Sequence, residues 1–407
     1  MNVPAIVALT ILVLTYIGVA AGRIPGLRLD RTGFAFLGGA AMIAVGPMSL
    51  SEAFGAVNLD TIAMLIGMMI VVAHLKVSGA FRLLGALVMR HAHAPLVLLA
   101  TVTALSGLLS AFLVNDAICL VMTPIVLQVM RALKRNPVPY LIATAAASNC
   151  GSVATITGNP QNMAIGAASK IPFVAFAASL APVAAFGLLA TVLIVWLVFR
   201  KEFPRGPAFA PEVRDARAHK GQVVKACVVS LGLAVALFAG APPAEAALIA
   251  GAVLLFTRSI KPARIYGEID GALLVLFAGL FIVVAGAEKA LLTPERIALV
   301  QGFGLDVPWR LTIVTAVLSN VVSNVPAVLI LRPFIPGLLD PTRAWLVVAM
   351  ASTLAGNLTL IGSVANLIVA QGAESEGVPI TFWAYFKVGL PLTLITLAAG
   401  TAWLTWM

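Results

Sequence analysis

The sequence predicts an all-α polytopic membrane protein, built as two inverted repeats that each hold five transmembrane helices and one re-entrant hairpin. Three observations predict this fold: the composition, the spacing of the apolar runs, and a set of motifs that occurs twice. Of the 407 residues, 61% are hydrophobic and 10% are charged, and the mean hydropathy is +1.05. Because soluble domains average about 25% charged residues, this composition excludes a soluble catalytic domain.

Apolar runs close to the ~20 residues that cross a bilayer recur along the whole chain, but two pairs of runs cannot be separate spans. Only two residues separate the runs 94–113 and 116–133, and only two separate the runs 308–322 and 325–340. Each pair is therefore one long broken helix or a re-entrant hairpin. A hairpin tip at membrane depth would have to be buried in protein or to face a water-filled cavity, because irregular backbone is tolerated nowhere else in a bilayer.

The second half of the chain repeats motifs of the first half in the same order. Repeated halves with broken segments in matching positions are typical of transporters, and they indicate where the binding site lies. The matching motifs are "MLIGMMIVVA" (64–73) with "LFAGLFIVVA" (276–285), "FLVNDAICLVMTPIV" (112–126) with "VVSNVPAVLILRPFI" (321–335), and "ASNCGSVATITGNPQNMAIG" (147–166) with "ASTLAGNLTLIGSVANLIVA" (351–370).

These motifs divide the chain into two repeats, each with a hairpin followed by a broken helix. Five spans per repeat is an odd number, so the second repeat would enter the membrane upside down relative to the first. The expected segments are the first repeat 1–200 with hairpin 94–133 and broken helix 138–169, a cytoplasmic linker 201–222, and the second repeat 223–407 with hairpin 308–340 and broken helix 343–372.

The distribution of basic residues supports this topology. The chain has 26 Lys and Arg residues and a net charge of +10, which we interpret as a sign of membrane orientation and not of nucleic-acid binding. Cytoplasmic loops of membrane proteins are enriched in Lys and Arg. Most of the Lys and Arg residues fall on one side of the membrane when the hairpins are not counted as spans, and counting them as full spans would remove this bias. We therefore expect both termini outside the cytoplasm and a location in the inner (plasma) membrane. The loops expected to be cytoplasmic are 22–32, 76–93, 131–137, 200–225 and 258–264.

The stretch "TITGNPQNMAIG" (155–166) predicts an unwound segment inside a span. Gly158 relaxes the steric limits on the backbone, and Pro160 breaks the helix and frees carbonyl groups upstream. Freed carbonyls, hydroxyls and the amides of Asn159 and Asn162 are hard oxygen donors that suit a cation. The half-helix that restarts after them would point its positive end at an anion. The alternative is a kinked span whose polar groups satisfy only one another.

The hairpin tips contain Asn115 and Asn324 at matching positions, together with one charged residue, Asp116. An intramembrane carboxylate is costly and indicates a functional site. We expect Asp116 to carry a proton or to bind Na⁺. The alternatives are that the two Asn residues only form turns, and that Asp116 only accepts a hydrogen bond from a backbone N–H.

At these residues the chain resembles a known group of transporters. "LSAFLVNDAICLVMTPIVL" is similar to the hairpin of bacterial arsenite permeases. "SNCGSVATITGNPQN" resembles the broken-helix signature of the ion transporter superfamily, which includes the divalent anion/sodium symporters, the citrate transporters and the D-type Na⁺/H⁺ antiporters. The resemblance implies a scaffold domain plus a transport domain made of two hairpins and two broken helices. It also implies two sodium sites: Asn115, Ser148, Asn149, Gly151 and Asn159 for one, and Asn324, Ser352, Thr353, Asn357 and Ser363 for the other.

From the motifs and the resemblance we assign candidate site residues. The expected metal ion is Na⁺ at Asn115, Asp116, Ser148 and Asn149, and no other cofactor is expected. No Lys or Arg lies in either motif, so we expect none in the substrate pocket. The candidates for substrate binding are Asn115, Asn159, Asn162, Asn324, Ser363 and Asn366, and those for ion coupling are Asp116, Ser148, Asn149, Gly151, Thr155, Ser352, Thr353, Asn357 and Thr359.

The function expected from these residues is secondary active transport of a small anion or oxyanion, arsenite or antimonite included, coupled to H⁺ or Na⁺ by alternating access. The alternatives are a Na⁺/H⁺ antiporter, a dicarboxylate or citrate symporter, and a passive channel. An enzyme is not expected, since no His-Glu-x-x-His or Gly-x-Ser-x-Gly stretch occurs. The chain also has no Walker A stretch. The expected partners are the substrate and the lipid bilayer but no nucleic acid, while a homodimer and a cytoplasmic ATPase partner stay open.

Overall fold

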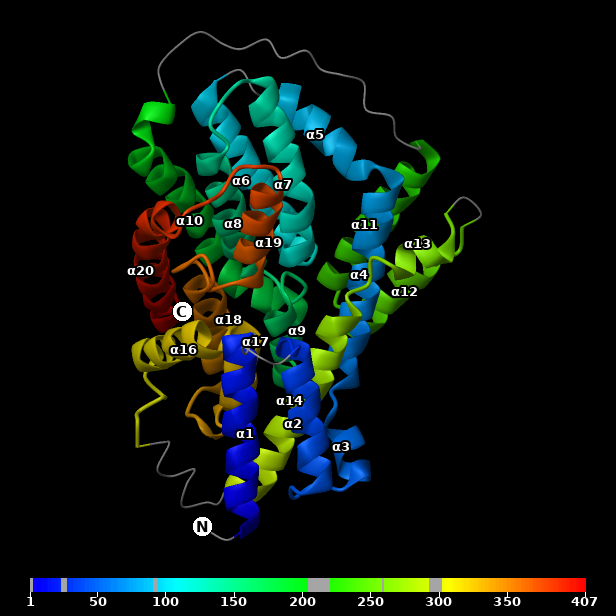
Figure 1. Cartoon of the computed structure of the whole chain (residues 1–407), viewed down its shortest axis with the longest axis vertical. Helices are drawn as coiled ribbons and strands as arrows, with labels where there is room; N and C mark the ends of the chain where they lie inside the picture. Colours follow the sequence, from blue (N-terminus) through cyan, green and yellow to red (C-terminus); the bar gives the residue numbers. More distant parts are fainter. Residues whose placement is uncertain (1–2, 23–27, 91–93, 204–219, 258–259, 293–301) are drawn as a thin grey trace.

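The computed structural model describes residues 3–22, 28–90, 94–203, 220–257, 260–292 and 302–407. The all-α prediction is confirmed, since every regular element in these ranges is helical (Figure 1). Eight of the described helices are long and apolar enough to cross a membrane. The first half contains α1 (Val3–Ala21), α2 (Arg31–Ala44), α3 (Leu50–Ala56), α4 (Leu59–Ser78), α5 (Ala80–Arg90), α6 (Pro95–Phe112), α7 (Asn115–Ala132), α8 (Val138–Ser152), α9 (Pro160–Ser169), α10 (Phe173–Val198) and η1 (Arg200–Glu202).

The second half follows the same order of elements. Its helices are α11 (Lys220–Phe238), α12 (Pro243–Leu255), α13 (Pro262–Tyr266), α14 (Gly271–Leu291), α16 (Pro308–Val322), α17 (Asn324–Leu331), η2 (Ile335–Gly337), α18 (Pro341–Ala355), α19 (Val364–Ser375) and α20 (Phe382–Trp406). Most of the expected linker 201–222 lies outside the described residues. Helix α11 begins at Lys220, two residues before the expected end of this linker.

Both pairs of closely spaced apolar runs form hairpins and not long broken helices. Helix α6 ends at Phe112, α7 begins at Asn115, and the two helices pack against each other; α16 and α17 do the same (Figure 1). The second arms differ in length although both halves carry a proline at the matching position. Pro124 lies inside α7, whereas α17 ends before Pro333. Pro336 follows three residues later, so two missing N–H groups prevent the helix from resuming there.

The two halves are locked together by crossed packing of matching helices. Helix α4 of the first half packs on α12 of the second, and α14 of the second half packs on α2 of the first. Each contact is made through a glycine of the repeated motif. A Cβ atom on Gly67 would lie 2.4 Å from the Ala247 backbone, and one on Gly279 would lie 2.4 Å from the Ala35 carbonyl oxygen. The repeat boundaries and the inversion of one half relative to the membrane stay predictions.

Substitution of Gly67 by alanine is expected to lower the thermal stability of the protein. The added methyl group would push α4 and α12 apart, and overpacking of this kind costs about 1–3 kcal/mol. The matched control is Gly232→Ala in α11, because a Cβ atom there would meet nothing within 4 Å. Unfolding temperatures in detergent test this, and equal melting of the two variants would contradict the close helix contact.

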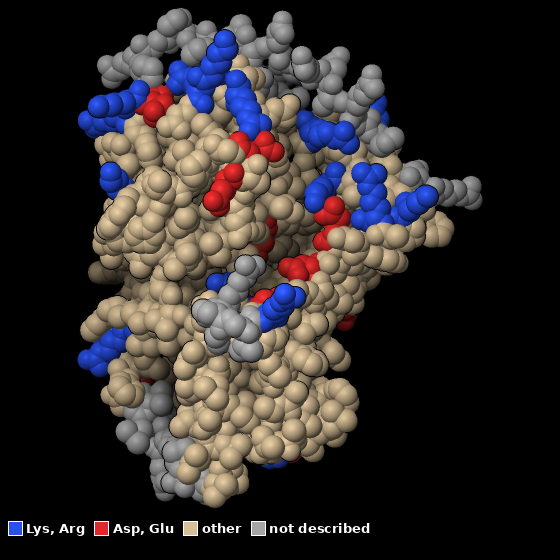
Figure 2. All heavy atoms as spheres, viewed as in Figure 1, with Lys and Arg blue, Asp and Glu red and all other residues tan. Residues whose placement is uncertain are grey.

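Charged side chains are distributed unevenly over the surface. In Figure 2 the basic side chains gather over the end of the molecule that carries α5 and α13, while few cover the opposite end in this view. Acidic side chains lie deeper, toward the middle of the same face. By the positive-inside rule, the end of a membrane protein that is rich in Lys and Arg faces the cytoplasm. The assignment of the basic end to the cytoplasm stays a prediction.

Candidate functional site

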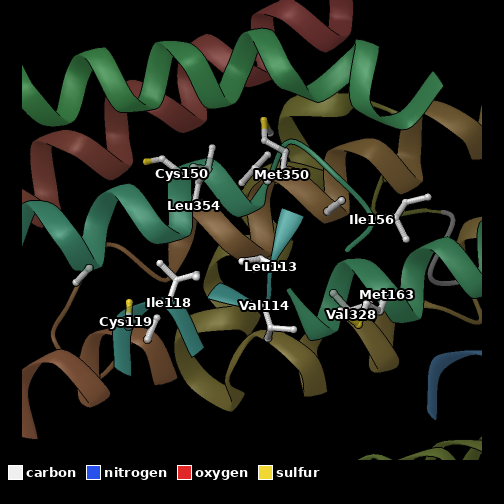
Figure 3. Packing of buried hydrophobic residues seen from close by; sticks show 14 of the residues in the cluster. Leu113, Val114, Ile118, Cys119, Cys150, Ile156, Met163, Val328, Met350 and Leu354 are labelled. Atoms are coloured by element: carbon white, nitrogen blue, oxygen red, sulfur yellow. The ribbon is translucent and has the colours of Figure 1, made fainter. Parts of the chain in front are cut away.

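The site lies where the two hairpin tips meet the two broken helices, in the centre of the protein. Figure 3 shows the apolar packing around it: Leu113 and Val114 at the first hairpin tip lie among buried side chains of both halves, such as Met163 and Val328. Tight apolar packing fixes the positions of the backbone groups at both tips. The polar groups of the site are therefore held in place by a core from both halves.

Each broken helix is stabilised by the amide of one asparagine at the start of its second piece. Asn162 Nδ2 donates to the carbonyl oxygens of Ser152 (3.1 Å) and Thr155 (2.9 Å). Asn366 Nδ2 donates in the same way to Gly356 (2.7 Å) and Thr359 (3.0 Å). The carbonyls that unwinding frees are thus bound by side chains, as buried backbone groups require. Thr155 and Thr359, expected to couple ions, contribute these carbonyls.

The first hairpin tip is bound to the first broken helix by three hydrogen bonds. The Asn115 N–H donates to the Gly158 carbonyl (3.0 Å), and Asn115 Nδ2 donates to Asn149 Oδ1 (3.2 Å). The Ser148 hydroxyl donates to the Asn115 carbonyl (3.1 Å). These contacts place three of the four expected Na⁺ ligands, Asn115, Ser148 and Asn149, in one cluster.

The second hairpin tip is held differently. The Ser319 hydroxyl lies 2.6 Å from Asn324 Oδ1 and 2.8 Å from the Ser352 carbonyl oxygen. Ser323, between α16 and α17, has a φ of +79°. A residue other than glycine at positive φ is strained by about 1–3 kcal/mol, and such strain clusters at functional sites. The second tip is therefore under backbone strain, which the surrounding contacts must hold.

Asn149 joins the two halves of the site. Its side chain is fully buried, and its Nδ2 donates to Asn357 Oδ1 (2.9 Å) and Asn366 Oδ1 (3.0 Å). Its Oδ1 accepts from the Ser363 hydroxyl (3.1 Å) and from Asn115. Residues of the two implied sodium sites are thus joined directly: Asn149 and Asn115 of the first are hydrogen-bonded to each other, and Asn149 is also bonded to Asn357 and Ser363 of the second.

Other candidate residues contribute to packing as well as to polar contacts. Gly151 gives α8 a close approach to α6, because a Cβ atom there would lie 2.1 Å from the Gly107 carbonyl oxygen. The Thr155 hydroxyl donates to the Ala111 carbonyl at the end of α6. Asn159 caps α9 and reaches the Thr353 hydroxyl of the other half (3.3 Å). The roles of these residues in ion coupling stay predictions.

Two buried asparagine oxygen atoms of the site, Asn115 Oδ1 and Asn162 Oδ1, have no hydrogen-bond partner within the described part of the chain. The matching atoms of the second half are both satisfied. Asn324 Oδ1 accepts from Ser319, and Asn366 Oδ1 accepts from Asn149. An unsatisfied buried acceptor is costly, so the two halves are not chemically equal: of these four amide oxygens, only the two of the first half are free.

Two cavities meet at Asp116, which is half-buried at the start of α7. The central cavity, about 70 Å³, is formed by both hairpin tips, the starts of α9 and α19, and side chains of α1, α2 and α14. The acidic cavity, about 150 Å³, borders Lys76, Glu268 and Asp270. The Asp116 carboxylate is thus reached from both cavities. The polar lining residues of the central cavity include Arg31, Asn115, Asp116, Gln161, Asn324 and Ser363.

Comparison with known proteins assigns the family. The family model described as citrate transporter matches residues 12–340 and 296–406, which together cover most of the chain. The chain belongs to the citrate transporter family. Members of this family are secondary transporters, so the protein is a membrane transporter.

The relatives of this citrate transporter family member are named for different substrates or for none. The silicon efflux transporter LSI3 of Oryza sativa subsp. japonica is 28% identical over 93% of each chain. An uncharacterized transporter of Mycobacterium tuberculosis is 28% identical over 98% of each chain. The putative transporter arsB of Dictyostelium discoideum is 23% identical over 92% of this chain and 87% of its own.

A solved structure shows the same fold. The crystal structure of the Alcanivorax borkumensis YdaH transporter, whose topology is described as unusual, matches with a TM-score of 0.62 at 16% identity. The match covers 100% of this chain and 98% of the YdaH chain. The architecture described above is therefore that of a known transporter fold.

Although no Lys or Arg was expected between the two broken helices, Arg31 lines the central cavity of this citrate transporter family member. The sequence placed Arg31 in the loop 22–32. It is instead the first residue of α2, after the N-cap Asp30, whose side chain accepts from the Gly33 N–H (2.8 Å). Only tertiary packing brings the start of α2 to the hairpin tips, so no local signal identifies Arg31.

Ser319 and Gln161 also belong to the site, although neither was among the residues expected there. Gln161 Nε2 donates to the Thr353 hydroxyl (3.0 Å) and so links the first broken helix to the second. The sequence position of each residue could have identified it as a candidate. Gln161 lies inside the motif between Asn159 and Asn162, and Ser319 lies at the position of α16 that matches Ser110 of α6.

Proposed function

We propose that this transporter moves a small oxyacid or its anion, of the arsenous or silicic acid type, by alternating access and coupled to H⁺ or Na⁺. The observation that carries the proposal is the central cavity, which lies where both hairpin tips and both half-helix starts meet. We place the transporter in the inner (plasma) membrane, with both termini outside the cytoplasm.

The size and charge of the central cavity favour a small substrate over citrate. A volume of about 70 Å³ holds roughly five water-sized groups, if each needs about 10–15 Å³. Its lining has one cation, Arg31, and one carboxylate, Asp116, so the fixed charges cancel. A tricarboxylate would need several cations, whereas a hydroxylated oxyacid carries little or no charge. Its hydroxyl groups suit the amide and hydroxyl groups of Gln161, Asn324 and Ser363.

The names of two relatives are in line with this substrate class. One is named for silicon efflux and one is a putative arsB. Silicon and trivalent arsenic both occur in neutral water as uncharged molecules with several hydroxyl groups on one central atom. A cavity that binds silicic acid therefore offers hydrogen-bond donors and acceptors that also suit arsenous acid.

The coupling ion is proposed to act at the first half of the site. The free acceptors Asn115 Oδ1 and Asn162 Oδ1 are both there, and amide oxygens are suitable ligands for a hard cation. Asp116 is next to Asn115 in the chain and borders both cavities. The Asp116 carboxylate can therefore take up a proton from the acidic cavity while the central cavity holds the substrate.

A second candidate function is Na⁺/H⁺ antiport. The acidic cavity favours it, since Asp116, Glu268 and Asp270 line one space of about 150 Å³. Glu268 is paired with Lys76 at 2.5 Å, and Asp270 caps α14 by accepting from the Leu273 N–H. This leaves Asp116 as the carboxylate of this cavity that binds no other described residue. An antiporter would exchange its ions there without an oxyacid.

Uptake into proteoliposomes tests the proposed function. We expect arsenous acid and silicic acid to accumulate under an imposed pH or Na⁺ gradient without ATP, while citrate does not. Protein-free liposomes are the control, since uncharged oxyacids leak through lipid. Citrate accumulation would contradict the substrate class. A pH change driven by Na⁺, with no oxyacid uptake, would establish the antiporter instead.

A further inference from the structure

We propose that Arg31 and Asp116 hold the transported molecule between them, so that the substrate itself bridges the scaffold and the first hairpin. This inference rests on the proposed function and names the groups that would recognise the oxyacid. It assigns a substrate-binding role to Arg31, a residue of α2 that belongs to neither the hairpins nor the broken helices.

Two opposite charges face one small cavity without touching. Arg31 and Asp116 both line the central cavity, and both are half-buried. Among the described residues, neither side chain forms an ion pair or accepts or donates a hydrogen bond, although five other ion pairs occur there. Charges taken partly out of water are costly when unpaired. A molecule placed between them would compensate both.

A molecule that compensates both charges must carry both hydrogen-bond acceptors and hydrogen-bond donors. Arg31 can only donate, through a planar fork of N–H groups. An ionised Asp116 can only accept. A bare cation would satisfy Asp116 alone, and a fully ionised anion would satisfy Arg31 alone. A protonated oxyacid has hydroxyl groups to donate to Asp116 and oxygen atoms to accept from Arg31, so it satisfies both ends.

The backbone at Arg31 is held in place at the start of α2. Asp30 caps the helix that Arg31 begins, and the Gly33 N–H is its donor. The same helix is locked on α14, where a Cβ atom on Gly39 would lie 3.4 Å from the Gly279 backbone. A guanidinium that starts from a fixed backbone position can favour substrates whose oxygen atoms match its planar fork. Asp116 lies on the first hairpin, so a substrate bound by both residues connects α2 to that hairpin.

Substrate affinity of two Arg31 variants tests the inference. Arg31→Gln removes the charge, and Arg31→Lys keeps the charge but loses the fork. We expect both to raise the KM for arsenous and silicic acid at least tenfold, with the number of ions moved per substrate unchanged, because coupling lies at Asp116. The matched control is Arg28→Gln, which removes an exposed charge three residues earlier in the chain and is expected to keep the wild-type KM.

The outcomes separate this inference from the proposed function. If the wild-type protein accumulates the oxyacids and Arg31→Gln has the same KM, Arg31 does not bind the substrate and only this inference fails. If the wild-type protein accumulates no oxyacid, the proposed function fails first. Should Arg31→Gln not fold, Arg31→Lys decides alone. A wild-type KM in that variant would show that the geometry of the guanidinium is not used.

Discussion

Replacement of Asp116 by asparagine is expected to abolish substrate accumulation driven by an ion gradient while the protein stays folded. Asparagine has the same shape but can neither ionise nor carry a transferable proton. Asp116 forms no ion pair with the described residues and borders both cavities. A carboxylate in a low-dielectric site exchanges its proton for a cation because a bound cation stabilises its ionised form. We expect at least a tenfold loss of gradient-driven uptake.

Exchange transport provides the sharper test of Asp116. Substrate counterflow across equal ion concentrations needs no coupling step, so Asp116→Asn is expected to retain it better than accumulation. The matched control is Asp60→Asn, which removes an exposed carboxylate paired with Lys170 (3.2 Å). Wild-type accumulation and wild-type ion dependence in the Asp116 variant would return this residue to a structural role.

Replacement of Asn149 by alanine is expected to have the largest effect on folding and activity together. The change would leave Asn115 Nδ2, Asn357 Oδ1, Asn366 Oδ1 and the Ser363 hydroxyl without their partner. Each buried group left unsatisfied costs about 1–3 kcal/mol. Since the network joins both halves, we expect a fall in the unfolding temperature in detergent and a loss of transport of about a hundredfold or more.

A buried residue with no partner is the control for Asn149. The Thr103 hydroxyl is buried and makes no hydrogen bond within the described ranges. Thr103→Val therefore removes a buried polar group without orphaning another, and it is expected to keep or raise thermal stability. If Asn149→Ala melts and transports like Thr103→Val, the amide network does not hold the two halves together.

Local patterns made much of the fold predictable. Apolar runs identify the long helices because backbone groups in lipid must be satisfied within a segment. Pairs of runs separated by two residues indicate the hairpins, and Pro160 after Asn159 marks the start of α9. The different lengths of α7 and α17 were not predictable from the matching prolines Pro124 and Pro333, because the continuation of a helix past proline depends on its later residues and packing.

The candidate site was predictable where the two halves repeat and not where they meet. The matching positions of Asn162 and Asn366 identify the amides that bind the freed carbonyls. The cross-links made by Asn149 join residues more than 200 positions apart, so no local pattern reveals them. Arg31 was missed for the same reason, since its place at the cavity depends on how α2 packs on α14.

The crossed glycine contacts also affect how the protein is made. The ribosome releases the chain from the N-terminus, so α2 and α4 reach the membrane before their partners α14 and α12 exist. Until Gly279 and its helix have been synthesised, the face of α2 around Gly39 has no close-packed neighbour. Until then the first half lacks the contacts of α2 with α14 and of α4 with α12. The packed interfaces at Gly67 and Gly279 therefore form only when helices of both halves are present.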